Sequence, residues 1–220
     1  MKNSDFHNYV IKNGKFIGNF EYMYQHFEFP WDQKDRELFQ SEKAIIINHL
    51  KKIGKCNVIE LGCGLGYFTE KIRQEIIKES KILGIDISKT AIKKAKKRFP
   101  KCFFQVADVL DFQIYQKFNP DVIVMSQISW YILPKLKKLL DYLKNNFPDI
   151  IIIHTLVTYT NEDQKYGREF FTNMDEILRF FDMNYLEKWS YSESSDNTRT
   201  WFVGNFKKDN NKLKNQILVY

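Results

Sequence analysis

Three glycines spaced by single residues follow an apolar run in the segment VIELGCGLGYF, residues 58–68. A strand, a glycine-rich turn and a helix form the general arrangement that holds a nucleotide at the carboxyl edge of a parallel sheet. The dinucleotide pattern G-x-G-x-x-G is absent, because Tyr67 stands at its last position and Gly66 comes one residue earlier. Glu60 precedes the loop, and a carboxylate there would repel a pyrophosphate and attract a cation. The segment therefore predicts a site for a positively charged nucleoside.

Two further acids stand at the ends of the next two apolar runs. Asp86, in LGIDIS, could accept hydrogen bonds from both ribose hydroxyls, as the acidic residue of nucleotide-binding folds does. Asp108, in QVADVL, could accept from the adenine amino group while the N–H of Val109 meets a ring nitrogen. A single Asp is as often a helix cap or a turn residue. The three acids together predict S-adenosylmethionine, which carries an ammonium and a sulfonium and no phosphate.

The elements that position these acids alternate regularly between apolar runs and amphipathic stretches. Nearly continuous Ile and Val runs are typical of parallel strands that helices cover on both faces. Strands are expected at Asn57–Leu61, Ile82–Asp86, Cys102–Asp108, Asp121–Gln127 and Asp149–Leu156. Helices are expected at Tyr67–Lys78, Lys89–Arg98 and Pro134–Asn145, the last with Pro134 in its first turn. The pattern predicts a doubly wound, Rossmann-like α/β fold.

The alternation of apolar runs and amphipathic stretches ends after residue 156. A helix at Asn173–Phe181 leads to two aromatic-rich runs, Tyr185–Ser192 and Thr198–Phe206, which predict an antiparallel pair at the sheet edge. That edge is a candidate homodimer surface. We expect three parts: an N-terminal extension with cap helices at residues 1–52, including a helix at Arg36–Lys51; a core at residues 53–206; and a polar tail at residues 207–220.

Composition limits the classes of function. The 220 residues suit one α/β domain, and no apolar run approaches the roughly 18 residues that a membrane span needs. An N-terminus without an export signal and three cysteines without metal-ligand spacing favour a cytoplasmic protein with reduced thiols. The net charge of +7 permits a nucleic-acid partner, but lysine runs such as that at residues 93–97 are more typical of a solvated helix face.

On these motifs the sequence resembles the class I S-adenosylmethionine-dependent methyltransferases. The resemblance covers Glu21–Phe206, with VIELGCGLG as the glycine motif, GIDIS as the ribose motif and ADVL as the adenine motif. It implies a seven-stranded sheet whose last strand is antiparallel.

A closer resemblance is to nodulation-type small-molecule methyltransferases. It rests on SQISWYIL at residues 126–133, IIIIHTL at residues 150–156, and the pair Pro30 and Trp31. Gln127 stands where that group typically has Glu, so O- and N-methylation both stay open. The resemblance implies a small-molecule acceptor: a sugar, nucleotide-linked or phosphoramidate precursor of a surface glycan, in capsule or polysaccharide biosynthesis.

The family resemblance also implies roles for individual residues. Those implied at the cofactor are Glu60, Gly62, Gly64, Gly66, Asp86, Ile87, Asp108, Val109 and Gln127. Tyr24 and Trp31 of the cap are candidates for closing over the cofactor, with packing of the cap on the core as the alternative. His154, expected at the crevice where the fifth strand ends, is the candidate general base, with a buried structural histidine as the alternative. His26 is a second candidate base, and Tyr131 could position the acceptor.

Three alternatives remain. The first is an RNA or protein methyltransferase, which only the basic charge supports, and the Pro-Pro-aromatic signature of base and amide methylases is missing. The second is a non-catalytic, methyltransferase-like subunit. A dinucleotide oxidoreductase is third, and Glu60 and Tyr67 disfavour it.

Overall fold

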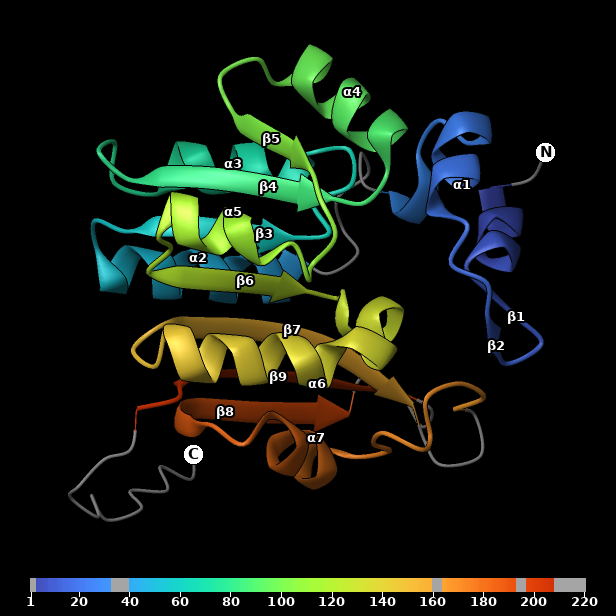
Figure 1. The fold of residues 1–220 in the computed structure, drawn as a ribbon. Coiled ribbons are helices and arrows are strands. Elements are labelled where there is room, and N and C mark those ends of the chain that lie inside the picture. The colour runs from blue at the N-terminus through green and yellow to red at the C-terminus, as the bar shows by residue number, and fades with distance from the viewer. Residues whose placement is uncertain (1–2, 33–39, 160–163, 193–196, 208–220) are drawn as a thin grey trace.

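The central element is a seven-stranded sheet with the strand order β5-β4-β3-β6-β7-β9-β8. The computed structural model describes residues 3–32, 40–159, 164–192 and 197–207. Its strands are β3 (Asn57–Leu61), β4 (Lys81–Asp86), β5 (Phe103–Val106), β6 (Val122–Ser126), β7 (Ile151–Tyr159), β8 (Asn184–Ser192) and β9 (Asn197–Asn205). Strands β3 to β7 pair in parallel, whereas β9 is antiparallel to both β7 and β8. All five parallel strands therefore end at one edge of the sheet (Figure 1).

Helices cover both faces of this sheet (Figure 1). On one face lie α2 (Gln40–Ile53), α3 (Tyr67–Glu75) and α4 (Lys89–Arg98), and on the other lie α5 (Phe112–Phe118), α6 (Ser129–Asn146) and α7 (Met174–Phe181). Two large buried clusters follow from this layering, one between the sheet and α5–α7 and one between the sheet and α2–α3. The strands are apolar on both faces because both faces are covered.

The N-terminal segment forms a cap at the carboxyl ends of the parallel strands (Figure 1). It contains two 3₁₀ turns, Asn3–Tyr9 and Pro30–Asp32, a small hairpin of β1 (Ile11–Lys12) and β2 (Lys15–Phe16), and helix α1 (Phe20–His26). The two-residue hairpin turn is Asn13-Gly14, and both residues have a positive φ, as a type I′ turn requires.

Polar contacts attach this cap to the N-terminal half of α4. The Glu21 carboxylate accepts hydrogen bonds from Ser88 Oγ at 2.7 Å and from Thr90 Oγ1 at 2.6 Å. The Lys94 ammonium donates to the backbone carbonyl of Tyr24. Lys94 is half-buried and holds the cap, so the expectation that the whole lysine run faces solvent is wrong at this residue.

The predicted fold class, a doubly wound α/β sheet with an antiparallel edge, is confirmed. Pro134 is not in the first turn of its helix as expected, because α6 begins at Ser129, where the chain turns directly out of β6. The helix expected in the cap at Arg36–Lys51 is α2 in its described part, and it packs on a face of the sheet and not in the cap. Residues 36–39 of that helix and all but the first residue of the predicted tail lie outside the described residues. No helix in the described ranges has the length and apolarity to cross a bilayer.

Candidate functional site

The glycine loop leaves β3 at the edge of the sheet where the cap sits. Gly62 has a φ of +69°, and a Cβ atom there would overlap the side chain of Ile128, so only glycine fits. Gly66 has a φ of +80°, and a Cβ atom there would meet the ring of Phe104 at 2.6 Å and the methyl of Ala95 at 3.0 Å. Gly62 lines the adjoining cavity, whereas Gly66 permits close packing between the loop, β5 and α4.

Asp86 lies at the end of β4 and faces the glycine loop. Its two carboxylate oxygens accept from the backbone N–H groups of Gly64 and Ser88, each at 2.9 Å. Burial raises the pKa of this carboxyl to about 6, and those two hydrogen bonds oppose the shift. Each oxygen keeps a second lone pair, so the carboxylate can still accept from a diol.

Glu60 lies beneath the loop and does not line the cavity. It is 4% exposed, and its carboxylate accepts a hydrogen bond from the hydroxyl of Thr69 in α3. Burial raises its pKa to about 7. At neutral pH this carboxyl is poised between its neutral and charged forms, so a cation above the loop would favour ionisation.

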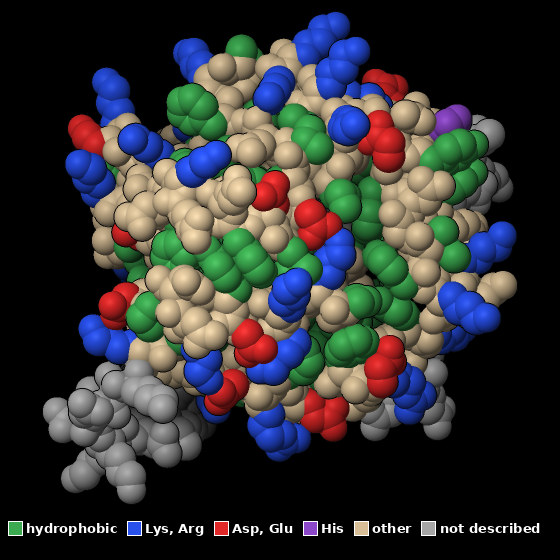
Figure 2. Space-filling model, viewed as in Figure 1, with side chains coloured by type: hydrophobic (Ala, Val, Ile, Leu, Met, Phe, Trp, Pro, Cys, Tyr) green, Lys and Arg blue, Asp and Glu red, His purple; other side chains and the backbone are tan. Residues whose placement is uncertain are grey.

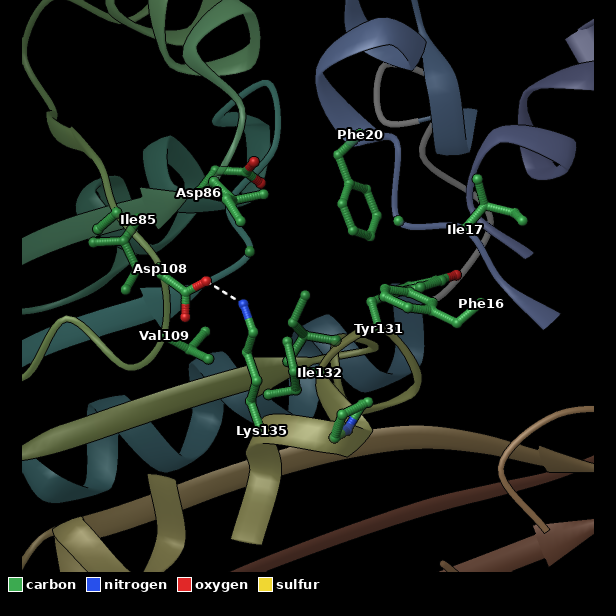
Figure 3. A pocket seen from close by; sticks show the side chains of 16 residues that line it. Phe16, Ile17, Phe20, Ile85, Asp86, Asp108, Val109, Tyr131, Ile132 and Lys135 are labelled. Atoms are coloured by element: carbon green, nitrogen blue, oxygen red, sulfur yellow. Dashed lines mark hydrogen bonds and ion pairs between the residues drawn. The ribbon is translucent and has the colours of Figure 1, made fainter. Parts of the chain in front are cut away.

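A cavity of about 300 Å³ lies between the strand ends and the cap (Figure 3). Asp86, Ile87, Asp108 and Val109, all predicted from the sequence, line it together. The other lining residues are Phe16, Ile17, Gly18, Phe20, Gly62, Ile85, Ala107, Ile128, Tyr131, Ile132, Pro134 and Lys135. Figure 3 places Asp86 and Asp108 on one side of this cavity and the rings of Phe16, Phe20 and Tyr131 on the other.

One face of α6 forms the wall between these two sides. The lining residues here have the i, i+3, i+4, i+7 spacing that places side chains on one helix face. They are the N-cap residue Ile128 and, within α6, Tyr131, Ile132 and Lys135. The Lys135 ammonium forms an ion pair with Asp108 Oδ2, and Asp108 Oδ1 accepts from the N–H of Leu110 at 3.0 Å. Sequence reasoning missed Lys135, although its position four residues after Tyr131 was a usable signal.

Aromatic side chains of the cap face the cavity opposite the acids. The ring centroid of Phe20 lies 5.8 Å from that of Tyr131, and the rings are nearly perpendicular. Phe16 at the end of the hairpin stacks on Tyr166, with centroids 5.8 Å apart. Sequence reasoning missed Phe16 and Phe20, although the Asn13-Gly14 turn signalled a hairpin. Burial raises the pKa of Tyr131, so its hydroxyl stays protonated and is a hydrogen-bond donor.

His154 does not reach this cavity, which corrects its assignment as the general base. Strand β7 continues five residues beyond His154, so this side chain lies within the sheet, with none of its surface exposed. Its Nε2 is 2.7 Å from Ser129 Oγ, and its ring stacks on Phe202 with centroids 4.6 Å apart. Burial lowers its pKa to about 3, so the imidazole is neutral. The alternative of a buried structural histidine fits these contacts.

Six more predicted residues lie outside the cavity lining: Tyr24, His26, Trp31, Gly64, Gly66 and Gln127. His26 is exposed at the end of α1, where its ring stacks on Tyr22. Tyr24 is buried inside the cap, and the ring of Trp31 contacts that of Tyr131, with centroids 5.1 Å apart.

Gln127 stands at the turn between β6 and α6 with a φ of +57°. Its Oε1 accepts from the N–H of Val157 at 3.0 Å, whereas its buried Nε2 has no hydrogen-bond partner among the described residues. A buried donor without a partner is costly, and a ligand acceptor would satisfy it.

The family model of the methyltransferase domain matches residues 53–215. A curated protein of Invertebrate iridescent virus 6, named as a methyltransferase, is 32% identical over 88 residues. That alignment covers 40% of this chain and 31% of the viral protein, so the chain spans about a third of this relative's length.

Solved methyltransferase structures have the same fold. The N-methyltransferase NodS of Bradyrhizobium japonicum, solved with S-adenosyl-L-homocysteine, superposes with a TM-score of 0.58 at 19% identity, covering 81% of this chain and 93% of NodS. The magnesium protoporphyrin IX methyltransferase of Synechocystis, solved with its bound methyl donor, gives a TM-score of 0.54 at 12% identity, covering 93% and 91% of the two chains.

Proposed function

The chain belongs to the methyltransferase domain family and has the class I fold of enzymes that use S-adenosylmethionine; from this premise we propose that it methylates a small metabolite. The observation that carries the proposal is Asp86, a buried carboxylate at a strand end that lines a cavity beside a glycine loop. This arrangement suits a ribose diol next to backbone that approaches the ligand closely.

The donor would lie along the strand ends, held by this chain's own residues. Asp86 would accept from the ribose hydroxyls, and Asp108 with Val109 would meet the adenine. Gly62, which lines the cavity without a side chain, would let the ligand approach the backbone of the loop. Glu60, with its pKa near neutrality, would attract the ammonium and sulfonium from beneath the loop, and Gln127 Nε2, a donor without a partner among the described residues, would donate to the ligand's carboxylate. When bound, S-adenosylmethionine supplies an electrophilic methyl group on a positively charged sulfur.

Most of the work left to the protein is alignment and exclusion of water, because methyl transfer from sulfur is an in-line displacement. The walls of the cavity would contribute to both alignment and exclusion of water. The cap places apolar rings across from the acids, and these rings would exclude water and confine an acceptor beside the donor. Tyr131 would orient the acceptor by donating its hydroxyl hydrogen.

For the acceptor we propose a neutral, ring-shaped portion of a sugar or nucleotide-linked precursor of a surface glycan. The rings of Phe16, Phe20 and Tyr131 support a flat or ring-shaped acceptor, since small-molecule sites combine an apolar lining with few polar groups. Lys135 is the cation among the lining residues, and Asp108 already neutralises it. These contacts favour a neutral portion over a phosphoryl or phosphoramidate group in this part of the cavity.

The proposal is tested by calorimetric titration with S-adenosylhomocysteine, with NAD as the comparison ligand. We expect micromolar binding of S-adenosylhomocysteine and none of NAD. A folded protein that binds neither ligand, or NAD alone, would refute the proposed cofactor. A panel of sugar and nucleotide-sugar acceptors with radiolabelled donor then tests the acceptor class.

A further inference from the structure

Lys135 and Asp108 form a paired donor and acceptor at one end of the cavity. The Lys135 side chain extends from α6 to the Asp108 carboxylate (Figure 3). The N–H of Leu110 donates to the other oxygen of this carboxylate. Their side chains are 40% and 33% exposed, so the pair is open to a ligand in the cavity and is not sealed in the core. The surrounding walls include Ala107, Val109 and Ile132, which are apolar.

An adenine edge presents the complementary pattern. Its exocyclic amino group is a donor, and the ring nitrogens on either side of it are acceptors. A carboxylate beside an ammonium offers an acceptor and a donor at one place, as the side-chain amide does where proteins read adenine in DNA. A charged donor strengthens such a hydrogen bond, most of all against apolar walls.

We propose that Lys135 recognises the cofactor base, donating to an adenine ring nitrogen while Asp108 accepts from the amino group. This inference rests on the proposed function, because it places the adenine of S-adenosylmethionine at this end of the cavity. The inference adds Lys135 to the residues that contact the cofactor, and Lys135 lies outside the glycine, ribose and adenine motifs of the sequence. Lys135 also keeps the Asp108 carboxylate in place before the ligand arrives, which lowers the cost of ordering it on binding.

The experiment compares S-adenosylhomocysteine with its 1-deaza and 7-deaza analogues, in which a C–H replaces one ring nitrogen. Binding is measured by calorimetry for the unaltered protein, Lys135→Met and Lys135→Arg. Lys137→Met is the matched control, since Lys137 lies on the same helix and pairs with Asp141 at the surface. Arginine keeps a charged donor, whereas methionine keeps only the length of the side chain.

We expect the unaltered protein to bind one deaza analogue about tenfold more weakly than S-adenosylhomocysteine, as the loss of one charged hydrogen bond would produce. Lys135→Met should bind S-adenosylhomocysteine about tenfold more weakly and no longer distinguish that analogue. Lys135→Arg should retain the distinction, and Lys137→Met should match the unaltered protein.

Unchanged affinity in Lys135→Met would overturn the inference, as would a weakened variant that still distinguishes the analogue. Either result leaves the proposed function intact, provided that the unaltered protein binds S-adenosylhomocysteine. If the unaltered protein does not bind this ligand, the proposed function fails and the role of Lys135 fails with it.

Discussion

At the scale of single residues, Asp86 fixes the backbone around it and is also proposed to bind the ribose of the cofactor. It accepts from two backbone N–H groups and also lines the cavity. Asp86→Asn keeps one oxygen acceptor but loses the charge, so we expect S-adenosylhomocysteine to bind 10- to 100-fold more weakly, about 1.5–3 kcal/mol. Calorimetry measures this loss, and a thermal melt shows whether the variant is folded. Asp141→Asn, at the surface, is the control; equal affinities in the two variants would remove Asp86 from the site.

His154 illustrates a residue whose type suggested chemistry and whose environment excludes it. Its pKa is about 3 in the folded protein and about 6.5 when unfolded. Between these values the unfolded chain binds a proton that the folded protein does not, so the free energy of unfolding decreases as pH falls below about 6.5. The contribution is about 1.4 kcal/mol per pH unit, or roughly 2 kcal/mol at pH 5.

The variant His154→Phe lacks this titration. Urea unfolding at pH 7 and pH 5 should show the stability of the unaltered protein falling relative to the variant by about 2 kcal/mol. The hydrogen bond lost by Ser129 lowers the stability of the variant equally at both pH values. We also expect His154→Phe to retain binding of S-adenosylhomocysteine. Retained binding with abolished methyl transfer, in a stably folded variant, would restore His154 as the base.

At the scale of secondary structure, the sequence predicted the sheet well because its signals are local. The run at residues 122–125 of β6 and the run at residues 151–153 of β7 are apolar throughout, and the run at residues 58–61 of β3 is interrupted only by Glu60, a pattern typical of strands that helices cover on both faces. The acids at the ends of β4 and β5 were found for the same reason: a strand end is visible in the pattern.

The residues that face the acids were harder to predict. Phe16 and Phe20 are far from the glycine loop in sequence, and they reach the cavity only because the cap folds over the strand ends. The error at His154 had a similar cause, since the length of β7 depends on its pairing with β9 and not on its own apolar run. The position of Phe16 and Phe20 and the length of β7 both depend on tertiary contacts. Such contacts leave no signal in the local sequence.

The attachment of α1 to α4 gives a prediction at this scale. Burial alone would raise the pKa of Glu21, but hydrogen bonds from Thr90 and Ser88 outweigh it and hold this pKa at about 2. Because the pKa is depressed, the stabilisation is present above about pH 4.5 and is lost as pH falls toward 2. The carboxylate also lies at the N-terminus of α4, where the helix dipole favours negative charge.

Glu21→Gln should therefore loosen the cap locally at pH 7, by about 1 kcal/mol. Hydrogen exchange should become about fivefold faster in α1, residues 20–26, while β3 and β6 keep their protection. Glu75→Gln is the control, because Glu75 pairs with Lys51 at the surface far from the cap. Uniformly faster exchange across the sheet would mean that Glu21 stabilises the whole fold and not the cap alone.

At the scale of the whole molecule, the charge of the visible surface bears on the choice of partner. On the face shown in Figure 2, Asp and Glu side chains are interspersed among the Lys and Arg side chains. Surface pairs such as Lys51 with Glu75 and Lys144 with Asp182 contribute little to stability in water. The charge of +7 therefore gives no directional support to a nucleic-acid partner on this face, and the cavity remains the feature that requires a function.

One buried ion pair connects distant parts of the chain. Arg199 in β9 donates to Glu42 in α2 at 2.7 Å across 157 residues of sequence, and the two side chains are 9% and 2% exposed. Desolvating both charges is costly, so the pair contributes little net stability compared with apolar residues of similar size. Removing one partner is different, because it leaves the other charge buried without its counter-ion.

We therefore expect Arg199→Met to lower the free energy of unfolding by about 3–5 kcal/mol, whereas the double variant Glu42→Met with Arg199→Met should lose much less. Urea unfolding of both single variants and the double variant gives the coupling energy. Glu187→Gln, whose carboxylate faces His49 at the surface, is the control for losing a charge near α2. Additive losses would show that the two side chains act separately. Strong coupling would show that one ion pair joins α2 to β9, and that the contribution of each side chain to stability depends on the other.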